Sequence, residues 1–353
     1  MLARARYPLT VWLATHAAVV AIAGLSIFLW PYVYTAKGSV QLPIGWLDGL
    51  CAWDCRAYAQ LAARGYDLPM TTNFWPLLPW TARPLVWLHV PPMLAVIVVA
   101  NAASLVAFVA VYRVFELVAD EAAARAGLLM LAVYPFSFFY AVGYTESLMV
   151  AAGAGAMWLA LRGRHVWAGV AFGAGVLARA PASLGWLGLA AEQHEQRTPW
   201  RTRAALLIPV AVGLLWPLHN WVRFDDPLAW MHARTLWGWH AKLSVIRGMM
   251  RWRESRMLLV YPFFALLPGA GVIGLLRERR WRSLAAIAAP SYVLFVAMGA
   301  YGLGRYTASV WPAFLPLGVW LARRPSLQTP IAVVLAIFQG LFLHLYAHAY
   351  ELQ

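Results

Sequence analysis

Long apolar stretches, separated by short polar or basic connections, follow one another along most of the chain. A stretch of roughly 20 apolar residues spans a bilayer as a helix, because lipid offers no partners to unpaired backbone groups. The pattern predicts an all-α polytopic membrane protein, with one integral-membrane domain over residues 1–353 and about 11 membrane segments. These stretches lie near 8–30, 91–112, 123–140, 143–161, 166–178, 182–191, 204–222, 257–276, 283–300, 306–321 and 329–347.

The composition excludes the main alternatives to a membrane protein. Charged residues make up 12% of the chain and hydrophobic residues 62%, whereas soluble domains carry about 25% charged residues. So little polar surface rules out a cytosolic enzyme, a disordered chain and a fibrous protein. The N-terminal apolar stretch lacks a convincing cleavage site, so we expect a retained first helix and not a signal peptide.

One pair of stretches, 166–178 and 182–191, is too short for two separate spans. Arg179, Ala180 and Pro181 divide them, which predicts a broken or re-entrant pair. On this interpretation Arg179 is structural and lies toward the cytoplasmic half.

The basic residues predict an orientation. The net charge is +14, and only two of the 28 basic residues are lysines, Lys37 and Lys242. Arginines cluster in short connections, so the positive-inside rule places the N-terminus in the cytoplasm. Two long loops, 31–83 and 223–256, and the C-terminus then lie outside. Short basic runs between apolar segments indicate contacts with membrane lipids, not with nucleic acid.

The first outer loop contains a candidate catalytic carboxylate. Residues 46–64 have helical apolar spacing, which predicts an amphipathic helix along the interface, ended by Gly65. Asp54 on this helix lies where lipid-borne substrates present their headgroups, and Trp53 and Tyr58 beside it are candidate substrate contacts. The alternative is a solvated Asp54 paired with Arg56.

Two further features of the sequence bear on metal binding. Cys51 and Cys55 flank the candidate carboxylate, but a zinc site needs more ligands than two. We therefore expect two ordinary small residues there. The adjacent Asp225 and Asp226 precede Pro227, which favours a turn over a metal site. A divalent metal has no clear motif in this chain, and no cofactor is assigned.

A second carboxylate follows a proline-rich aromatic segment. Pro135 is expected to end a helix, and Thr145 to cap the next one, with Glu146 in its first turn. A lone carboxylate in apolar surroundings near a membrane is functional by default. The alternative is a glutamate that offsets the helix dipole. We predict Glu146 to be catalytic and Tyr144 to contact substrate.

Basic residues on the outer side are candidate ligands of a lipid-linked phosphate. In the second outer loop, His240 and Lys242 lie near Trp237, and cationic side chains beside aromatic ones suit a phosphate headgroup at an interface. Trp237 is a candidate substrate contact. Arg305 lies in a short glycine-rich turn between two apolar stretches, where it can reach an anion. The alternatives are an anchoring amphipathic helix over 247–256 and an ordinary snorkelling Arg305.

In their order along the chain, these motifs resemble the PIG-V-like family, which is related to GPI mannosyltransferase 2 and belongs to the GT-C membrane glycosyltransferases. The segment Ala178-Arg179-Ala180-Pro181 departs from the Thr-Arg-Pro segment of the family, because its first residue is alanine and an extra alanine precedes the proline. The matching pieces are Trp53-Asp54 through Gly65-Tyr66, Phe74 through Pro79, Pro135 through Leu148, Ala178 through Pro181, Asp225 through Trp230, and Gly304-Arg305-Tyr306.

The resemblance implies a polytopic GT-C fold, and we expect a multi-pass protein of a prokaryotic plasma membrane. It also implies a polyprenyl-phosphate sugar donor, usually of mannose, and inverting transfer to a lipid or glycan acceptor on the extracytoplasmic face. The first-loop carboxylate of the family maps onto Asp54. The chemistry needs a base for the acceptor hydroxyl, and cations for the leaving phosphate, for which Arg305 with Lys242 or His240 is the candidate set.

The competing class is a lipid or sugar transporter or flippase. Such a protein is expected to have repeated halves and paired polar residues at the bilayer midplane. Here the acidic residues lie toward the outer edge, and no internal repeat is evident. The sequence also lacks the glycine-rich fingerprint of a nucleotide-sugar site. These features favour the transferase.

Overall fold

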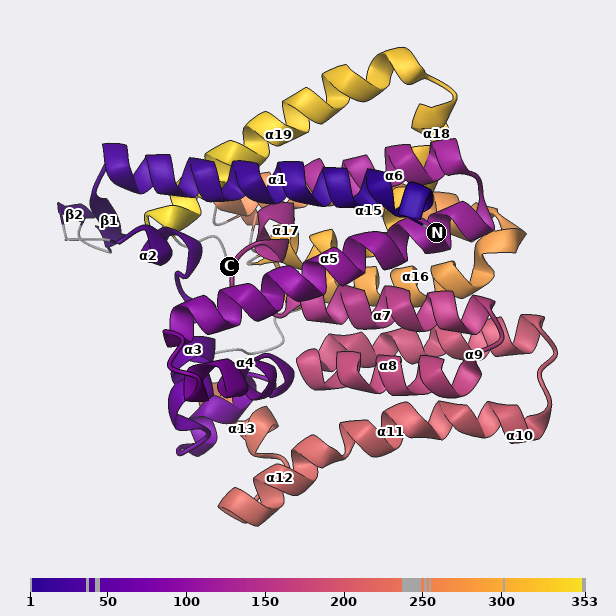
Figure 1. Cartoon of the computed structure of the whole chain (residues 1–353), viewed down its shortest axis with the longest axis horizontal. Coiled ribbons are helices and arrows are strands. Elements are labelled where there is room, and N and C mark those ends of the chain that lie inside the picture. The colour runs from indigo at the N-terminus through magenta and orange to yellow at the C-terminus, as the bar shows by residue number, and fades with distance from the viewer. Residues whose placement is uncertain are drawn as a thin grey trace.

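Helices form most of the described chain, as the apolar stretches predict (Figure 1). The computed structural model describes residues 2–35, 38–41, 45–236, 249–250, 253, 255–300 and 302–350. Within these residues, six helical segments are long and apolar enough to cross a membrane, which supports a multi-pass membrane protein. They are Arg6–Leu29 within α1 (Leu2–Leu29), Pro92–Val118 (α5), Trp200–Phe224, Met257–Arg277 (α15), Arg279–Met298 and Pro325–Ala347 (α19).

Two of these six are built from consecutive short helices. Residues Trp200–Phe224 comprise α10 (Trp200–Arg203), η4 (Ala204–Leu206), α11 (Leu207–Gly213) and α12 (Leu215–Phe224). Residues Arg279–Met298 comprise η5 (Arg279–Trp281) and α16 (Arg282–Met298).

Shorter helices occupy the remaining predicted stretches. They are α6 (Glu121–Val133), η2 (Ser137–Tyr140), α7 (Glu146–Leu161), α8 (His165–Ala178), η3 (Ala180–Gly185), α9 (Trp186–Glu195), α17 (Leu303–Ala308), η6 (Trp311–Ala313) and α18 (Phe314–Ala322). The predicted break between 166–178 and 182–191 is confirmed, because α8 ends at Ala178 and η3 leads into α9. All eleven stretches are thus at least partly helical, while a count of eleven membrane segments stays a prediction.

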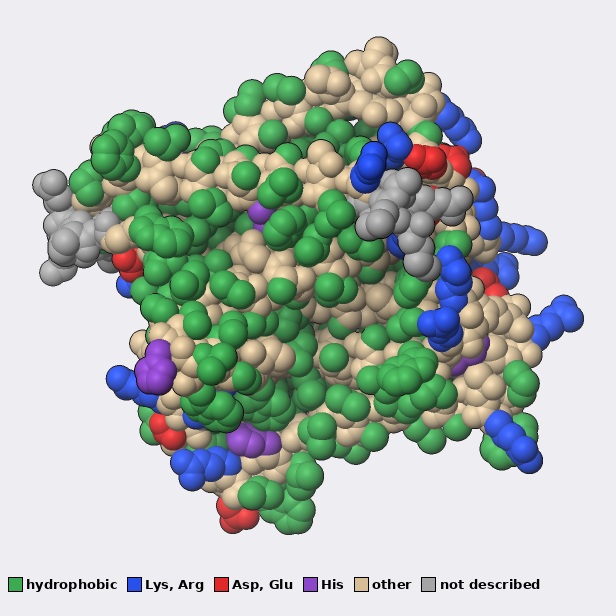
Figure 2. Space-filling model, in the orientation of Figure 1, with side chains coloured by type: hydrophobic (Ala, Val, Ile, Leu, Met, Phe, Trp, Pro, Cys, Tyr) green, Lys and Arg blue, Asp and Glu red, His purple; other side chains and the backbone are tan. Residues whose placement is uncertain are grey.

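The helices pack side by side around a continuous apolar core. In Figure 1, α5, α7, α8 and α11 follow one another, and each packs against the next. On the other side, α6 packs against α18, while α1 lies across α5 and α19. Large apolar side chains also point outward: Phe28 is 80% exposed and Val222 is 79% exposed. Such side chains lie at the surface in Figure 2, as expected where lipid is the solvent.

The two ends of the helix bundle differ. Arginine side chains gather at the edge where α9, α10 and α18 lie (Figures 1 and 2). The other end holds most of the first predicted outer loop. This loop folds as β1 (Tyr32–Thr35), β2 (Gly38–Gln41), α2 (Trp46–Leu50), α3 (Asp54–Arg64), η1 (Pro69–Asn73) and α4 (Leu77–Trp87), with α13 (Ala229–Leu236) against η1. The antiparallel pair, in which Tyr32 faces Gln41, is an addition to the predicted all-α fold.

Candidate active site

Four charged side chains from distant parts of the sequence meet at the end of the bundle that holds α3. Arg305 Nη1 donates to Asp54 Oδ2 at 3.0 Å, and Arg305 Nε lies 3.1 Å from Glu146 Oε1. Arg179 Nη1 donates to the same Glu146 oxygen. These four residues, here called the charged quartet, come from α3, the first residue of α7, the end of α8, and α17. Two cations and two carboxylates balance one another.

Asp54 owes its place to a break in the predicted interfacial helix. A single helix over 46–64 is wrong: α2 ends at Leu50, and α3 begins at Asp54. Between them Trp53 adopts φ 53°, a left-handed value that side chains with a Cβ rarely take. Gly65 ends α3 as predicted, with its N–H donating to Leu61. The break makes Asp54 the first residue of a helix and leaves it 28% exposed.

The two cysteines form a disulfide across this break. Cys51 and Cys55 are bonded, with their Cα atoms 5.0 Å apart, so the prediction of two ordinary small residues is wrong. The bond depends on the break, because Cβ atoms four residues apart on a regular helix lie about 5–6 Å apart, farther than a disulfide spans. The alternative of an Asp54–Arg56 pair is also wrong, since Arg56 bonds Asp48 at 2.9 Å.

Glu146 is the most deeply buried member of the charged quartet. The helix before it ends ahead of Pro135, as predicted, and Thr145 occupies the position before α7 without a capping side-chain bond. Glu146 is 1% exposed, and its Oε2 atom has no hydrogen-bond partner among the described residues. Its place at a helix N-terminus fits the dipole explanation. Ion pairs with two arginines, however, go beyond offsetting a dipole.

The place predicted for Arg179, at the opposite end of the bundle from Glu146, is wrong. Arg179 was expected toward the cytoplasmic half as a structural residue, but it follows the last residue of α8 beside Glu146. Its guanidinium lies 4.7 Å from the centroid of the Tyr306 ring. The signal was present, because an arginine within an apolar membrane stretch is costly unless it has a partner.

Arg305 connects both carboxylates. The alternative of an ordinary snorkelling arginine is wrong, because its side chain is 3% exposed and enclosed by ion pairs. Burial alone would lower the pKa of Arg305, but Glu146, Tyr306 and Asp54 outweigh burial and raise it. At Gly304, a Cβ would lie 2.5 Å from the ring of Phe136, so only glycine lets α17 approach this closely.

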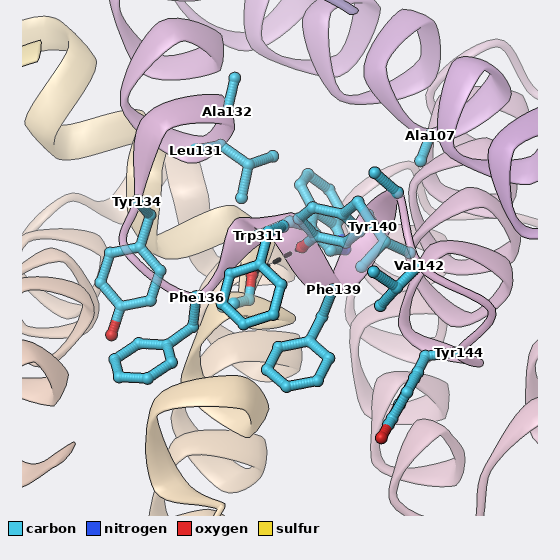
Figure 3. Close-up of a cluster of buried hydrophobic side chains, with 14 of the residues drawn as sticks. Ala107, Leu131, Ala132, Tyr134, Phe136, Phe139, Tyr140, Val142, Tyr144 and Trp311 are labelled. Atoms are coloured by element: carbon cyan, nitrogen blue, oxygen red, sulfur yellow. Dashed lines mark hydrogen bonds between the residues drawn. The ribbon is translucent and has the colours of Figure 1, made fainter. Parts of the chain in front are cut away.

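Aromatic rings support Arg305 from the core. Its guanidinium carbon lies 5.1 Å from the Tyr144 centroid, 5.0 Å from Tyr306 and 5.6 Å from Phe139. Figure 3 shows Phe136, Phe139 and Tyr144 within this buried cluster. Ring faces stabilise cations that have been removed from water.

The predicted substrate contacts differ in exposure. Trp53 is 39% exposed at the break before α3. Tyr58 is buried beside the charged quartet: burial raises its pKa, which Arg179 opposes and Asp54 and Glu146 reinforce. Tyr144 is fully buried, and its hydroxyl donates to Ala52 O at 3.2 Å, so it supports the break from the core.

The second outer loop is described only in part. Trp237, His240 and Lys242 lie outside the described residues. Before them, α13 brings Arg234 to the site. Burial lowers the pKa of Arg234, and the positive charge of Arg179 lowers it further, while Tyr306 acts in the opposite direction.

The predicted turn at Asp225-Asp226 is confirmed. Asp225 adopts φ 55° at the end of α12, and Asp226 Oδ1 accepts the N–H of Leu228 at 2.9 Å. The other oxygen of Asp226 bonds His232 Nδ1 at 2.7 Å, and this bond lowers the pKa of Asp226.

Comparison with known proteins gives one family match and several similar structures. Residues 33–196 match the family described as Mannosyltransferase (PIG-V), while no curated protein matches the chain by sequence. ArnT from Cupriavidus metallidurans bound to undecaprenyl phosphate has TM-score 0.60 at 15% identity, over 96% of this chain and 76% of ArnT. Apo ArnT from the same organism has TM-score 0.57 at 16% identity, over 98% and 77%. The apo oligosaccharyltransferase of Archaeoglobus fulgidus has TM-score 0.50 at 14% identity, over 96% of this chain and 56% of its own length.

At such low identities, likeness to these structures shows a shared fold. The family match adds the sequence pattern, and its range contains Asp54, Glu146 and Arg179 but ends before Arg305. The resemblance predicted from the motifs is confirmed. The chain matches the PIG-V mannosyltransferase family over residues 33–196 and shares the fold of ArnT.

Proposed function

We propose that this protein is a glycosyltransferase that takes mannose from a polyprenyl-phosphate donor and transfers it, with inversion, to a lipid or glycan acceptor. The charged quartet carries the proposal, because it holds a partly exposed Asp54 beside buried arginines at one end of a membrane bundle. The family match and the ArnT-like fold support it. A transporter would need such charges along a pathway across the membrane.

In the proposed reaction, the acceptor hydroxyl oxygen attacks C1 of the sugar from the face opposite the phosphate. The new C1–O bond forms as the bond from C1 to the phosphate oxygen breaks. The acceptor proton passes to the carboxylate of Asp54, and the lipid phosphate leaves with the bonding electrons. Arg305 holds Asp54 by an ion pair at 3.0 Å, which orients the base.

The leaving phosphate gains negative charge as the bond breaks, so the site must stabilise it. Arg305 and Arg179 supply fixed guanidinium groups, and Arg234 on α13 adds a third near Arg179. Arginine forks match phosphate oxygens well. Lys242 and His240 complete the proposed donor site from the second outer loop, and Trp53 and Tyr58 are its proposed sugar contacts.

A panel of donors tests which sugar is used. Polyprenyl phosphates carrying mannose, glucose or galactose would be offered to membranes containing the protein, together with a lipid extract as acceptor. Label is expected to transfer from the mannose donor at the highest rate. A higher rate with another sugar would overturn the choice of mannose and leave the lipid-phosphate chemistry intact.

Arg305→Ala is expected to raise the KM for the donor at least tenfold, since a lost charged hydrogen bond is worth about 1.5–3 kcal/mol. Arg253→Ala, on an exposed residue outside the charged quartet, should stay within about twofold, as a screened surface charge is worth about 1 kcal/mol or less. Donor titrations on both variants, each checked for monodispersity in detergent, make the comparison. Similar donor KM values in the two variants would contradict this assignment.

We further infer that the charged quartet faces the extracytoplasmic side of a prokaryotic plasma membrane. In this arrangement α3 lies along the interface, and about 11 segments enter the membrane. The arginines at the opposite edge of the bundle support this orientation, and so does the Cys51–Cys55 disulfide, since disulfides persist in oxidising compartments.

Cysteine labelling tests the orientation. An impermeant maleimide added to intact cells is expected to label Asp67→Cys, in the first outer loop, and to label Arg280→Cys only after the membrane is opened. Both side chains are more than half exposed, and the two native cysteines are bonded to each other. Labelling of Arg280→Cys in intact cells would reverse the orientation.

A further inference from the structure

The disulfide lies next to the proposed base. Cys51 and Cys55 close a ring of five residues that contains Asp54, and both cysteines are fully buried. The same ring contains Trp53 with its left-handed φ of 53°. A conformation of this kind persists only where the surrounding structure enforces it, and it often occurs at functional sites.

Two buried tyrosines hydrogen-bond the backbone of Ala52, which lies in the same ring. Tyr346 Oη accepts the N–H of Ala52 at 3.1 Å, and the Tyr144 hydroxyl donates to Ala52 O at 3.2 Å. Tyr144 also lies under the guanidinium of Arg305, the ion-pair partner of Asp54. The backbone just before Asp54 and the cation that holds its side chain therefore rest on one buried support.

Cys55 is fitted tightly against the segment that leads into α7. At Gly143, three residues before Glu146, a Cβ would lie 2.5 Å from Cys55 Sγ. The bridge therefore packs between the turn that bears Asp54 and the segment that bears Glu146.

We propose that the Cys51–Cys55 disulfide is a positioning device for Asp54, so that the enzyme has full activity only while the bridge is closed. This inference rests on the proposed function, in which Asp54 is the base. Opening the bridge takes two electrons and two protons. A dithiol such as dithiothreitol supplies them, becomes a cyclic disulfide, and leaves two protein thiols.

With the bridge open, the break before α3 loses its covalent closure, and the Asp54 carboxylate shifts relative to the acceptor hydroxyl. A misplacement of about 1 Å costs about 100-fold in rate. The proposed phosphate contacts Arg179 and Arg234 lie outside this turn, and of the proposed sugar contacts only Trp53 belongs to it. The inference therefore predicts a loss in kcat that is much larger than any change in the donor KM.

The experiment uses the full-length protein in detergent with polyprenyl-phosphate mannose. Because the chain has only two cysteines, maleimide labelling of the denatured protein reports the bridge directly. Protein purified without reductant is expected to show no free thiols, and two after exhaustive reduction. Reduction should lower kcat by about 100-fold, in line with the misplacement argument, and reoxidation should restore it. The double variant Cys51→Ser/Cys55→Ser should match the reduced enzyme and ignore dithiothreitol.

Two further variants separate positioning from general damage to the fold. Gly143→Ala crowds Cys55 Sγ and should lower kcat with the donor KM unchanged, whereas Gly155→Ala, on α7 where a Cβ has open space, should leave both unchanged. Two free thiols in protein purified without reductant would overturn the inference. So would an active double-serine variant with wild-type kcat. If the oxidised protein transfers no sugar, the proposed function fails, while the thiol count still decides whether the bridge exists.

Discussion

Asp54→Asn is expected to leave a folded, membrane-inserted protein that binds donor but has a kcat about 100- to 10,000-fold lower, the usual cost of losing a general base. The amide keeps the shape and volume of the carboxylate, but it cannot take the proton of the acceptor hydroxyl at neutral pH. Arg305 keeps Glu146 as its counterion in this variant, so the core should remain intact. Initial rates and donor affinity, measured on the same preparation, show whether catalysis is lost while donor binding is kept.

The matched control is Asp67→Asn. Asp67 lies in the same predicted outer loop, but it is 61% exposed and its ion pair with Arg223 is long, at 3.6 Å. Its kcat should stay within about twofold of the wild type, as expected for a surface pair worth about 1 kcal/mol or less. Retention of more than about a tenth of the activity by Asp54→Asn would remove this residue from the role of base.

Glu146→Gln is expected to lower the stability of the protein by about 3–5 kcal/mol, because it leaves two buried arginines with one carboxylate between them. In the wild type, both guanidinium groups contact a single Glu146 oxygen, and the side chain is 1% exposed. The amide matches the shape of the carboxylate but carries no charge. A denaturant titration of each variant in detergent measures the change in the free energy of unfolding.

Glu121→Gln provides the comparison for this second effect. Glu121 pairs with Arg125 on the surface of α6, and its side chain is 60% exposed, so its loss should cost about 1 kcal/mol or less. Equal stabilities for the two variants would mean that the buried pairs contribute no more than exposed ones. A Glu146→Gln protein with wild-type stability and no transfer would instead show that Glu146 shares the role of base.

Much of the fold follows from the sequence, because apolar length decides which segments enter lipid. The ends of helices were also readable where proline or glycine enforces them, as at Pro135 and Gly65. The break before α3 could not be predicted in this way. Helical spacing continues through Trp53, so only the tertiary contacts of this segment reveal the left-handed residue and the bond between Cys51 and Cys55.

The members of the site were easier to find than their pairing. Asp54, Glu146 and Arg305 stand out as charges in apolar surroundings, which is costly without a function or a partner. Asp54 and Arg305, however, are 251 residues apart in the sequence, and hydrophobic periodicity does not predict contacts between such distant residues. Arg179 was placed at the wrong end for the same reason: its partner Glu146 is 33 residues away.

The central claim is that the charged quartet uses a lipid-phosphate sugar. Its most direct test is to incubate purified protein in lipid vesicles with labelled polyprenyl-phosphate mannose and an acceptor extract, and in parallel with labelled GDP-mannose. We predict transfer of label from the lipid donor, one polyprenyl phosphate released for each sugar transferred, and loss of both signals in Asp54→Asn. Transfer from GDP-mannose alone, or unchanged lipid-donor turnover in Asp54→Asn, would contradict the account.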